Sequence, residues 1–352
     1  MHTWWVFFSF LLEKKLSFLY IIVNAPAEPL SGFPICTLRR VVFFMDKQSY
    51  SKPPLSVIDQ IKLLKTRGLQ IPDEERAARY LHNISYFRLS GYMYPFLKDK
   101  KQHQYKDNTA FEDILNLYRF DRELRQLVFA SIEKIEIAIR SQIANHYSVS
   151  LTSPFWYTKP ENFSEPSEYS QFINNISQYI NRSNDIFVKH FFKTYNEPHL
   201  PIWVLLEILS IGQLSHLYGI TAKSPPKKAV ADYFGIKDPV LSNWLHTLVY
   251  VRNTCAHHSR LWNKELSIQI KKPRKTSRLW CVSLNISDRK IYIILAVIAY
   301  LLDAITPNNT FRKKIDSLIL KYPAVDTSAM GFPKDWKNDP FWSGASKFLD
   351  TQ

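Results

Sequence analysis

Apolar residues recur every three to four positions through most of the chain, which is the spacing of one face of an α-helix. The longest such stretch runs from Phe111 to about Tyr147 without proline or glycine and predicts one long helix, or two joined by a kink. The apolar run Ile291–Leu302 is too short to span a membrane and predicts a core helix. Further helical patterns cover 57–64, a segment from Asp73, 167–194, 201–218, 239–260, 289–304 and 310–321. Strand patterns are few, the clearest being a short hairpin arm at 279–286, so we expect an all-α protein.

The helical patterns divide the chain into a small unit and a larger bundle. Ser56 has the character of an N-cap, with Asp59 at the third helical position, and a lysine-rich loop follows at 98–109. We expect four parts, which are an N-terminal extension (1–44), a small helical N-terminal unit (45–109), a helical bundle (110–325) and a C-terminal tail (326–352).

The first 44 residues differ from everything after them. Two apolar stretches, Trp4–Leu12 and Leu16–Val23, are separated by a charged triplet, and neither is long enough to span a bilayer. A signal peptide would carry its charges at the start of the chain, whereas here the apolar stretch Trp4–Leu12 precedes them. We favour a misplaced start codon, with translation beginning at Met45, over the two membrane interpretations.

Composition narrows the function classes. The chain has 46 Lys+Arg against 31 Asp+Glu, a formal charge of +15, and it is still +13 without residues 1–44. This charge indicates a polyanionic partner such as nucleic acid, with an inert basic surface as the alternative. Only 8 glycines and no glycine-rich phosphate loop argue against repeated nucleotide-binding βαβ units. Three scattered cysteines support neither a disulfide framework nor a CxxC metal site, so we expect a reducing, cytoplasmic location.

The densest basic stretch lies between two predicted helices. Beside a nucleic-acid site it would make salt-dependent phosphate contacts, and elsewhere it is an ordinary solvated loop. Its members are Lys271, Lys272, Arg274, Lys275 and Arg278.

A charged residue on the apolar stripe of the 239–260 helix is the first sign of chemistry. At 100° per residue Arg252 falls with the apolar face, whereas Asn253 and His257 fall on the opposite side. An unpaired buried charge is very costly, so Arg252 requires a carboxylate partner or a functional anion. Glu136 and Glu207 lie inside apolar helices and are the candidate partners for an internal ion pair.

Arg252 and His257 are about 140° apart on a straight helix, because His257 follows Arg252 by five positions. They converge on one phosphate only if the helix ends or kinks near Ala256, or if two copies of the segment face each other. The second arrangement predicts a two-fold homodimer with a composite site.

At this segment the sequence resembles a known family. Arg252-Asn-x-x-x-His257 matches the Arg-x4–6-His signature of the HEPN superfamily of helical ribonucleases. A longer motif resembles the Abi-like (abortive infection, AbiD/AbiF-type) branch of bacterial phage-defence proteins. This motif is Arg252-Asn253-x-x-Ala256-His257-His258-x-Arg260-x-Trp262-Asn263. Other agreeing segments are Lys52-Pro53-x-Leu55, Ile84–Tyr92, Phe120-Asp121-Arg122-x-Leu124-Arg125, Leu200–Trp203, Gly212-x-Leu214-Ser215 and Met330–Pro333. Arg-x4-His alone is a weak pattern, but the ordered set from about residue 52 to 340 is much more specific.

The resemblance implies a HEPN-like helical bundle and a metal-independent endoribonuclease toxin of phage defence that uses no cofactor. His257 would be the general base or acid and Arg252 the phosphate clamp, with Asn253 orienting the histidine. His258 also fits the allowed spacing, and we prefer His257 because it shares a helix face with Asn253. Arg260 would contact RNA. A neutral histidine suits this chemistry because it takes the proton of the ribose 2′-OH, whose attack leaves a 2′,3′-cyclic phosphate.

Several alternatives stay open beside this reading. The expected partners are RNA, a second copy of the chain, and an antitoxin or small regulatory RNA, with no membrane unless residues 1–44 are translated. A non-catalytic RNA-binding or interaction module is the main rival to an enzyme. A zinc site on Cys255, His257 and His258 is disfavoured because adjacent ligands point apart, and a Cys255 nucleophile lacks an oxyanion loop. The aromatic stretch 86–96 has two interpretations. Its rings could stack on bases, but we prefer that they pack between the N-terminal unit and the bundle.

Overall fold

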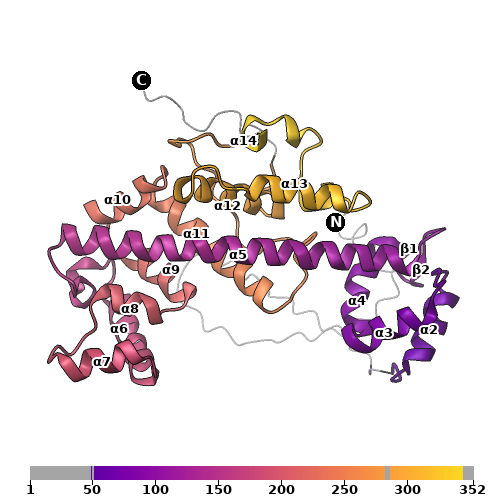
Figure 1. Ribbon diagram of the computed structural model, residues 1–352, viewed down its shortest axis with the longest axis horizontal. Helices are drawn as coiled ribbons and strands as arrows, with labels where there is room; N and C mark the ends of the chain where they lie inside the picture. The colour runs from indigo at the N-terminus through magenta and orange to yellow at the C-terminus, as the bar shows by residue number, and fades with distance from the viewer. Residues whose placement is uncertain (1–48, 50, 282–285, 344–352) are drawn as a thin grey trace, which may run out of the picture. The chain divides into compact units, whose positions relative to one another are not determined.

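The computed structural model describes residues 49, 51–281 and 286–343, and nearly all of its regular structure is helical (Figure 1). In this described part the strands are β1 (Leu97–Asp99) and β2 (Gln104–Tyr105), a short antiparallel pair inside the segment expected to be a loop. The expected hairpin arm at 279–286 carries no strand where it is described, and residues 282–285 lie outside the described residues, as do residues 1–48. The all-α prediction is confirmed.

Three short helices precede the bundle, and local sequence explains where they begin and end. They are α2 (Val57–Thr66), α3 (Glu74–Ile84) and α4 (Tyr86–Met93). Gly68 adopts φ +87° after α2, and the Asp73 side chain caps α3 by accepting from the backbone N–H of Arg76 at 2.8 Å. Ser85, at φ +72°, separates α3 from α4 and caps α4 through the N–H of Arg88.

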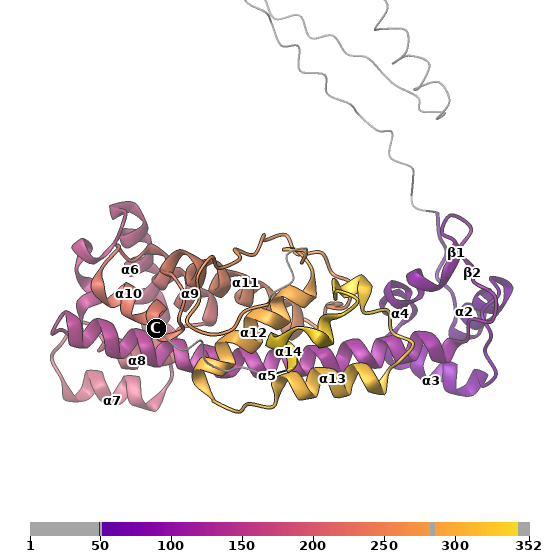
Figure 2. The same ribbon diagram turned by 90° about the horizontal axis from the view of Figure 1, so that it is seen from above.

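Helix α5 (Phe111–Ser150) is one continuous helix of 40 residues, about 60 Å long. Its buried side chains keep the helical spacing along its length, and it packs against α4 and most helices of the bundle (Figure 2). Of the two alternatives, the single long helix is the one observed, because no residue interrupts the hydrogen-bond ladder and produces a kink.

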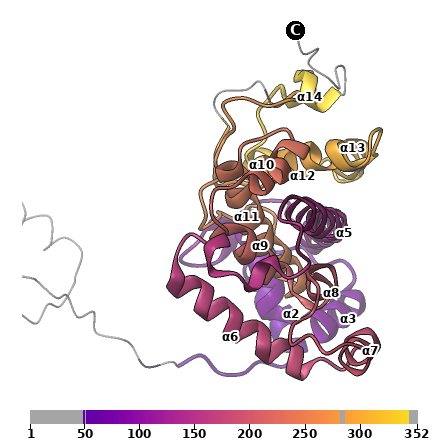
Figure 3. The same ribbon diagram turned by 90° about the vertical axis from the view of Figure 1, so that its left-hand side faces the viewer.

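The remaining helices surround α5, with α13 and α14 on one side and α6 to α8 on the other (Figure 3). Their bounds are α6 Pro166–Arg182, α7 Ile186–Thr194, α8 Ile202–Ile208, α9 Ile211–Ile220, α10 Pro225–Tyr233, α11 Asp238–Ala256, α12 Ile291–Ile305, α13 Phe311–Lys321 and α14 Pro340–Ser343. The patterns at 167–194 and 201–218 therefore each hold two helices. Helix α10 was not predicted, because Pro225-Pro226 looks like a helix breaker, yet proline is tolerated in a first turn capped by Ser224.

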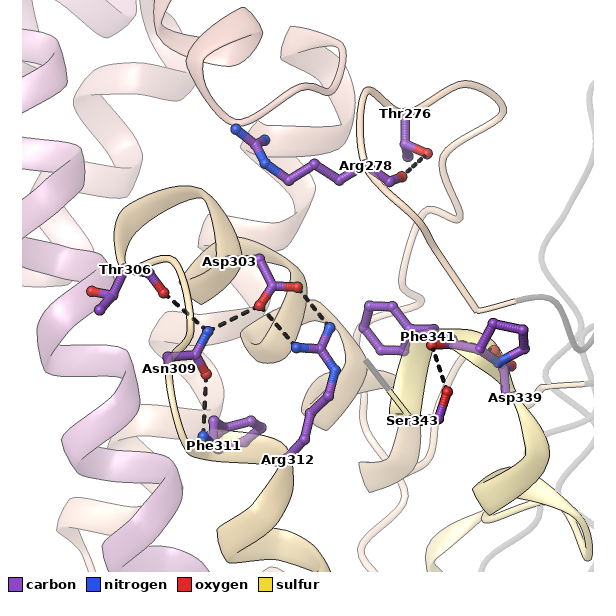
Figure 4. Close-up of polar contacts among 11 residues, drawn as sticks. Thr276, Arg278, Asp303, Thr306, Asn309, Phe311, Arg312, Asp339, Phe341 and Ser343 are labelled. Carbon is purple, nitrogen blue, oxygen red and sulfur yellow. Dashed lines mark hydrogen bonds and ion pairs between the residues drawn. The ribbon is translucent and has the colours of Figure 1, made fainter. Parts of the chain in front are cut away.

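Helix α12 lies in the core, as its pattern predicts, since every residue from Ile291 to Leu302 is buried. No helix in the described ranges is both long and apolar enough to cross a membrane. Arg312 of α13 binds Asp303 of α12 through two parallel hydrogen bonds of 2.8 and 2.7 Å, and its guanidinium lies 4.3 Å from the ring centroid of Phe341 (Figure 4). This cluster ties α12, α13 and α14 together.

Candidate functional site

Helix α11 ends at Ala256, directly before the two adjacent histidines. The N–H of His258 donates to the Cys255 carbonyl and that of Ser259 to the Thr254 carbonyl, both at 3.0 Å, and His258 has φ +55°. This pair of hydrogen bonds with a left-handed residue is a Schellman termination. The chain leaves the helix axis after Ala256, which is the first of the two conditions under which Arg252 and a histidine approach one ligand.

The segment after α11 is held by Asp121, a fully buried carboxylate in the middle of α5. Its Oδ1 accepts from the backbone N–H groups of Leu261 and Trp262 at 3.0 and 2.5 Å. Its Oδ2 accepts from the Tyr92 hydroxyl at 2.6 Å and pairs with the Arg125 guanidinium. Such a set of donors is what allows an ionised carboxylate to be buried, and here it joins α4, α5 and the segment after α11.

Helix α4 holds the same segment from a second direction. Arg88 donates to the backbone carbonyl of His258 at 2.7 Å, and Arg260 donates to the carbonyl of Gly91. Arg260, expected to contact RNA, therefore uses its guanidinium to fasten the segment to α4. The backbone around His258 is fixed by groups from two other helices.

A cleft of about 590 Å³ opens at this junction of α4, α5 and the end of α11. Arginine side chains and His258 give it basic character, and none of its lining residues is acidic. Such a lining is suited to an anion. The lining residues are Arg88, Tyr118, Arg122, Arg125, Gln126, Phe129, Cys255, Ala256 and His258.

Arg252 is not one of the lining residues but lies beside the cleft, against Phe129, which lines it. Its guanidinium stands 5.4 Å from the ring centroid of Phe129, and its closest hydrogen bond is a long one of 3.4 Å to the side-chain oxygen of Asn253. The expected internal ion pair is absent from the described residues, because Glu136 and Glu207 lie against Arg140 instead, at 2.5 and 3.6 Å. Arg252 is half-buried with no carboxylate beside it in the described part of the chain.

The two histidines occupy different surroundings. Both are exposed, but only His258 is among the residues that line the cleft. On the helix, His257 falls with Asn253 and Tyr250, away from Arg252. The structure therefore places His258 in the cleft and Arg252 beside it, against Phe129, while Asn253 contacts Arg252 and His257 stays outside the lining.

The cleft is assembled from segments that belong to a known family. The sequence matches the family described as Abi-like protein over residues 79–263, which is more than half of the chain. The chain belongs to the Abi-like family. The match spans α4, α5, α11 and the segment through Asn263, so it contains every residue of the cleft. No match was found among the curated proteins or the solved structures.

The basic loop of this Abi-like protein lies at the other end of α11. Four of its cations are exposed and line a second cavity of about 970 Å³ with Lys237, namely Lys271, Lys272, Arg274 and Lys275. Arg278 differs, since it is half-buried and its Nη1 is shielded from solvent. The 19 residues of α11 place this cavity about 27 Å from the cleft.

Cys255 lies at the floor of the cleft, but its chemistry is not that of a nucleophile. Burial raises the pKa of its thiol to about 12, so the reactive thiolate is scarce at neutral pH. Within the described ranges, no three His, Cys, Asp or Glu side chains gather as metal ligands.

Sequence reasoning missed three arginines of the cleft, Arg88, Arg122 and Arg125. They come from α4 and α5, far in sequence from Arg252. The available signal was their position inside two of the segments that agree with the Abi-like family, Ile84–Tyr92 and Phe120–Arg125.

Proposed function

We propose that this Abi-like protein is an endoribonuclease of abortive infection that cleaves RNA through attack of the ribose 2′-OH, without a metal ion. The proposal depends on one observation. In the described residues Arg252 has no carboxylate beside it and lies against Phe129, which lines a cleft together with three arginines and His258. A phosphate bound there would meet guanidinium groups and a proton-transfer group together. Family membership supports the setting in phage defence.

In the proposed reaction a neutral histidine takes the proton of the 2′-OH, and the oxygen attacks the adjacent phosphorus. The bond to the 5′-oxygen breaks, a protonated histidine gives its proton to that oxygen, and the products are a 2′,3′-cyclic phosphate and a 5′-hydroxyl. Arg252 and Arg122 stabilise the additional negative charge on the phosphate oxygens. In this proposal His258, which lines the cleft, would transfer the proton within one chain. His257, on the outer face of α11, would serve the cleft of a second copy in the expected homodimer.

The test uses the purified full chain and its Arg252→Ala, His257→Ala and His258→Ala variants, incubated with total bacterial RNA in EDTA, followed by mapping of the ends. We expect the parent to leave 2′,3′-cyclic phosphate ends and Arg252→Ala and His258→Ala to be at least about 100-fold slower. His190→Ala removes another exposed histidine, on α7, and should cut like the parent. Cleavage that persists in all variants would come from a contaminant and would end the assignment. Loss in His257→Ala but not in His258→Ala would return the catalytic role to His257.

A non-catalytic RNA-binding module is the second candidate function. This candidate is supported by the arginines and aromatic side chains of the cleft, which are sufficient to bind RNA without a histidine. This candidate predicts that RNA is retained by every form in a gel shift while none cuts it. Cleavage by the parent alone excludes it.

A further inference from the structure

Phe87 on α4 is exposed to an unusual degree, at 87%, and no large apolar side chain in the described residues exceeds it. It gains almost nothing from packing in this chain, while its neighbour Leu89 is completely buried. A single exposed apolar side chain is common on protein surfaces and does not by itself indicate a binding site. The residues around Phe87 therefore determine whether it has a binding role.

A second aromatic residue lies at the end of α4. Tyr94 is the C-cap residue of α4 and the first residue of a short 3-10 helix, Tyr94–Phe96, and its backbone is still helical. It follows Phe87 by seven positions, which places the two about 20° apart around the axis of α4 and about 10 Å apart along it. Tyr94 is half exposed, and the ammonium of Lys100 stands 4.9 Å from its ring centroid. The outer face of α4 therefore presents two rings with a cation beside one of them.

Arg88 links this face to the cleft, although it lies about 100° from Phe87 around the axis of α4. Arg88, next to Phe87 in the sequence, lines the cleft and donates to the His258 carbonyl. A strand of nucleic acid whose phosphate reaches Arg88 would bring an adjoining base to Phe87. Rings that alternate with cations are the arrangement by which proteins hold single strands.

We propose that the outer face of α4 binds single-stranded RNA that enters the cleft, with Phe87 stacking on a base and Arg88 contacting the adjoining phosphate. The proposal rests on the proposed function, since it takes RNA as the substrate. Single strands are required because the bases of a duplex are stacked on one another and offer no free face to Phe87.

Charge argues against a second copy of the chain as the occupant of this face. A two-fold contact through α4 would bring Arg88 and Lys100 against the same two residues of the other copy. Like charges at such short range repel, whereas the phosphates of RNA neutralise them. Phe87 and Tyr94 thus lie on a surface that favours a polyanion.

The test measures binding by fluorescence anisotropy, using a labelled 12-nucleotide single strand that is 2′-O-methylated throughout, and the matching duplex. The methyl groups block attack by the 2′-OH, so binding is measured whatever the chemistry. We expect Phe87→Ala and Phe87→Leu each to weaken single-strand binding about tenfold and Phe87→Trp to retain it, because stacking needs a ring. The matched control is Ile186→Ala on α7, a side chain of 86% exposure that should leave affinity unchanged. Duplex affinity should change less than twofold in every variant.

Each outcome decides the proposal. Phe87→Ala or Phe87→Leu binding like the parent, equal losses for duplex and single strand, or a parent that binds no single strand would each overturn it. A changed oligomeric state of Phe87→Ala in size-exclusion chromatography with light scattering would identify an interface between copies instead. A parent that binds through Phe87 but never cuts RNA would end the proposed endoribonuclease and leave this inference intact. A parent that cuts RNA while Phe87→Ala binds normally would end this inference alone.

Discussion

Asp121 is the residue on which the geometry of the site depends. It is completely buried, and its two oxygens accept hydrogen bonds from α4, from α5 and from two backbone N–H groups after α11. Removing its charge would leave the Arg125 guanidinium, itself 5% exposed, without a counter-ion. The histidine segment would also lose part of the anchor that sets its path.

We expect Asp121→Asn to lower the free energy of unfolding by about 3 kcal/mol, because breaking one side of a buried ion pair leaves an uncompensated charge. Urea denaturation followed by circular dichroism measures the change. The matched control is Asp232→Asn, which breaks an exposed pair with Lys228 at the same spacing of four residues. It should change the unfolding free energy by less than about 0.5 kcal/mol. Equal effects of the two substitutions would contradict the anchoring role of Asp121.

At this scale the sequence predicts single unusual residues well and their partners poorly. Arg252 was found because a charge on an apolar stripe violates the helical pattern, and that signal is local. Its partner was expected to be Glu136 or Glu207, but both lie against Arg140. Which carboxylate meets which cation depends on how α5, α8 and α11 cross, and helix periodicity carries no information about crossing.

The end of α11 shows how one element prepares the site. His258 is the residue after the helix cap and adopts φ +55°, where glycine is normally preferred. A non-glycine residue held in this region stores strain, and such positions concentrate at functional sites. His257, one residue earlier, has φ −83° and carries no such strain.

We therefore expect His258→Gly to raise the free energy of unfolding by about 1 kcal/mol, which is the cost of placing an ordinary residue in the left-handed region. The same variant should lose the proposed cleavage, so that stability and activity change in opposite directions. His257→Gly is the neighbouring control and should lower the unfolding free energy by about 0.5–1 kcal/mol, since glycine gains nothing at φ −83°. Urea titrations of the three proteins measure both changes, and a destabilised His258→Gly would show that the termination is not strained.

Prediction of the elements was best where periodicity extends over many residues, as in α5 and α12. It was weakest where a short break carries no glycine or proline, as between α6 and α7, where Ser183–Asp185 separate two helices. The position of the end of α11 is the detail that matters most for the site. From the sequence, an end near Ala256 could be stated only as one condition for Arg252 and His257 to converge. The usual signal for a helix end is glycine, whereas here the left-handed residue is His258.

For the molecule as a whole, the two basic cavities lie at opposite ends of α11. The arginine cleft lies at its C-terminal end and the exposed loop cations, with Lys237, lie at its N-terminal end. Only the cleft combines cations with a histidine and an aromatic wall, so we assign chemistry to the cleft and non-specific phosphate contacts to the loop. The two proposed roles are separable, because loop contacts with phosphates would depend on salt and would add to affinity without touching the reacting phosphate.

This separation predicts the behaviour of a variant in which the four exposed loop cations are replaced by glutamine, namely Lys271→Gln, Lys272→Gln, Arg274→Gln and Lys275→Gln. Each lost phosphate contact removes about 0.7 from the slope of log affinity against log salt for a single strand, so the slope should become shallower by up to about 3. The control has the same loss of charge at Lys189, Lys193, Lys314 and Lys334, which are exposed elsewhere. Anisotropy titrations of the 2′-O-methylated single strand measure the slopes. The salt concentration is varied from about 50 to about 200 mM, because phosphate contacts weaken strongly over this range. If both variants lose slope equally, the total charge of the protein, rather than the position of the loop, attracts RNA.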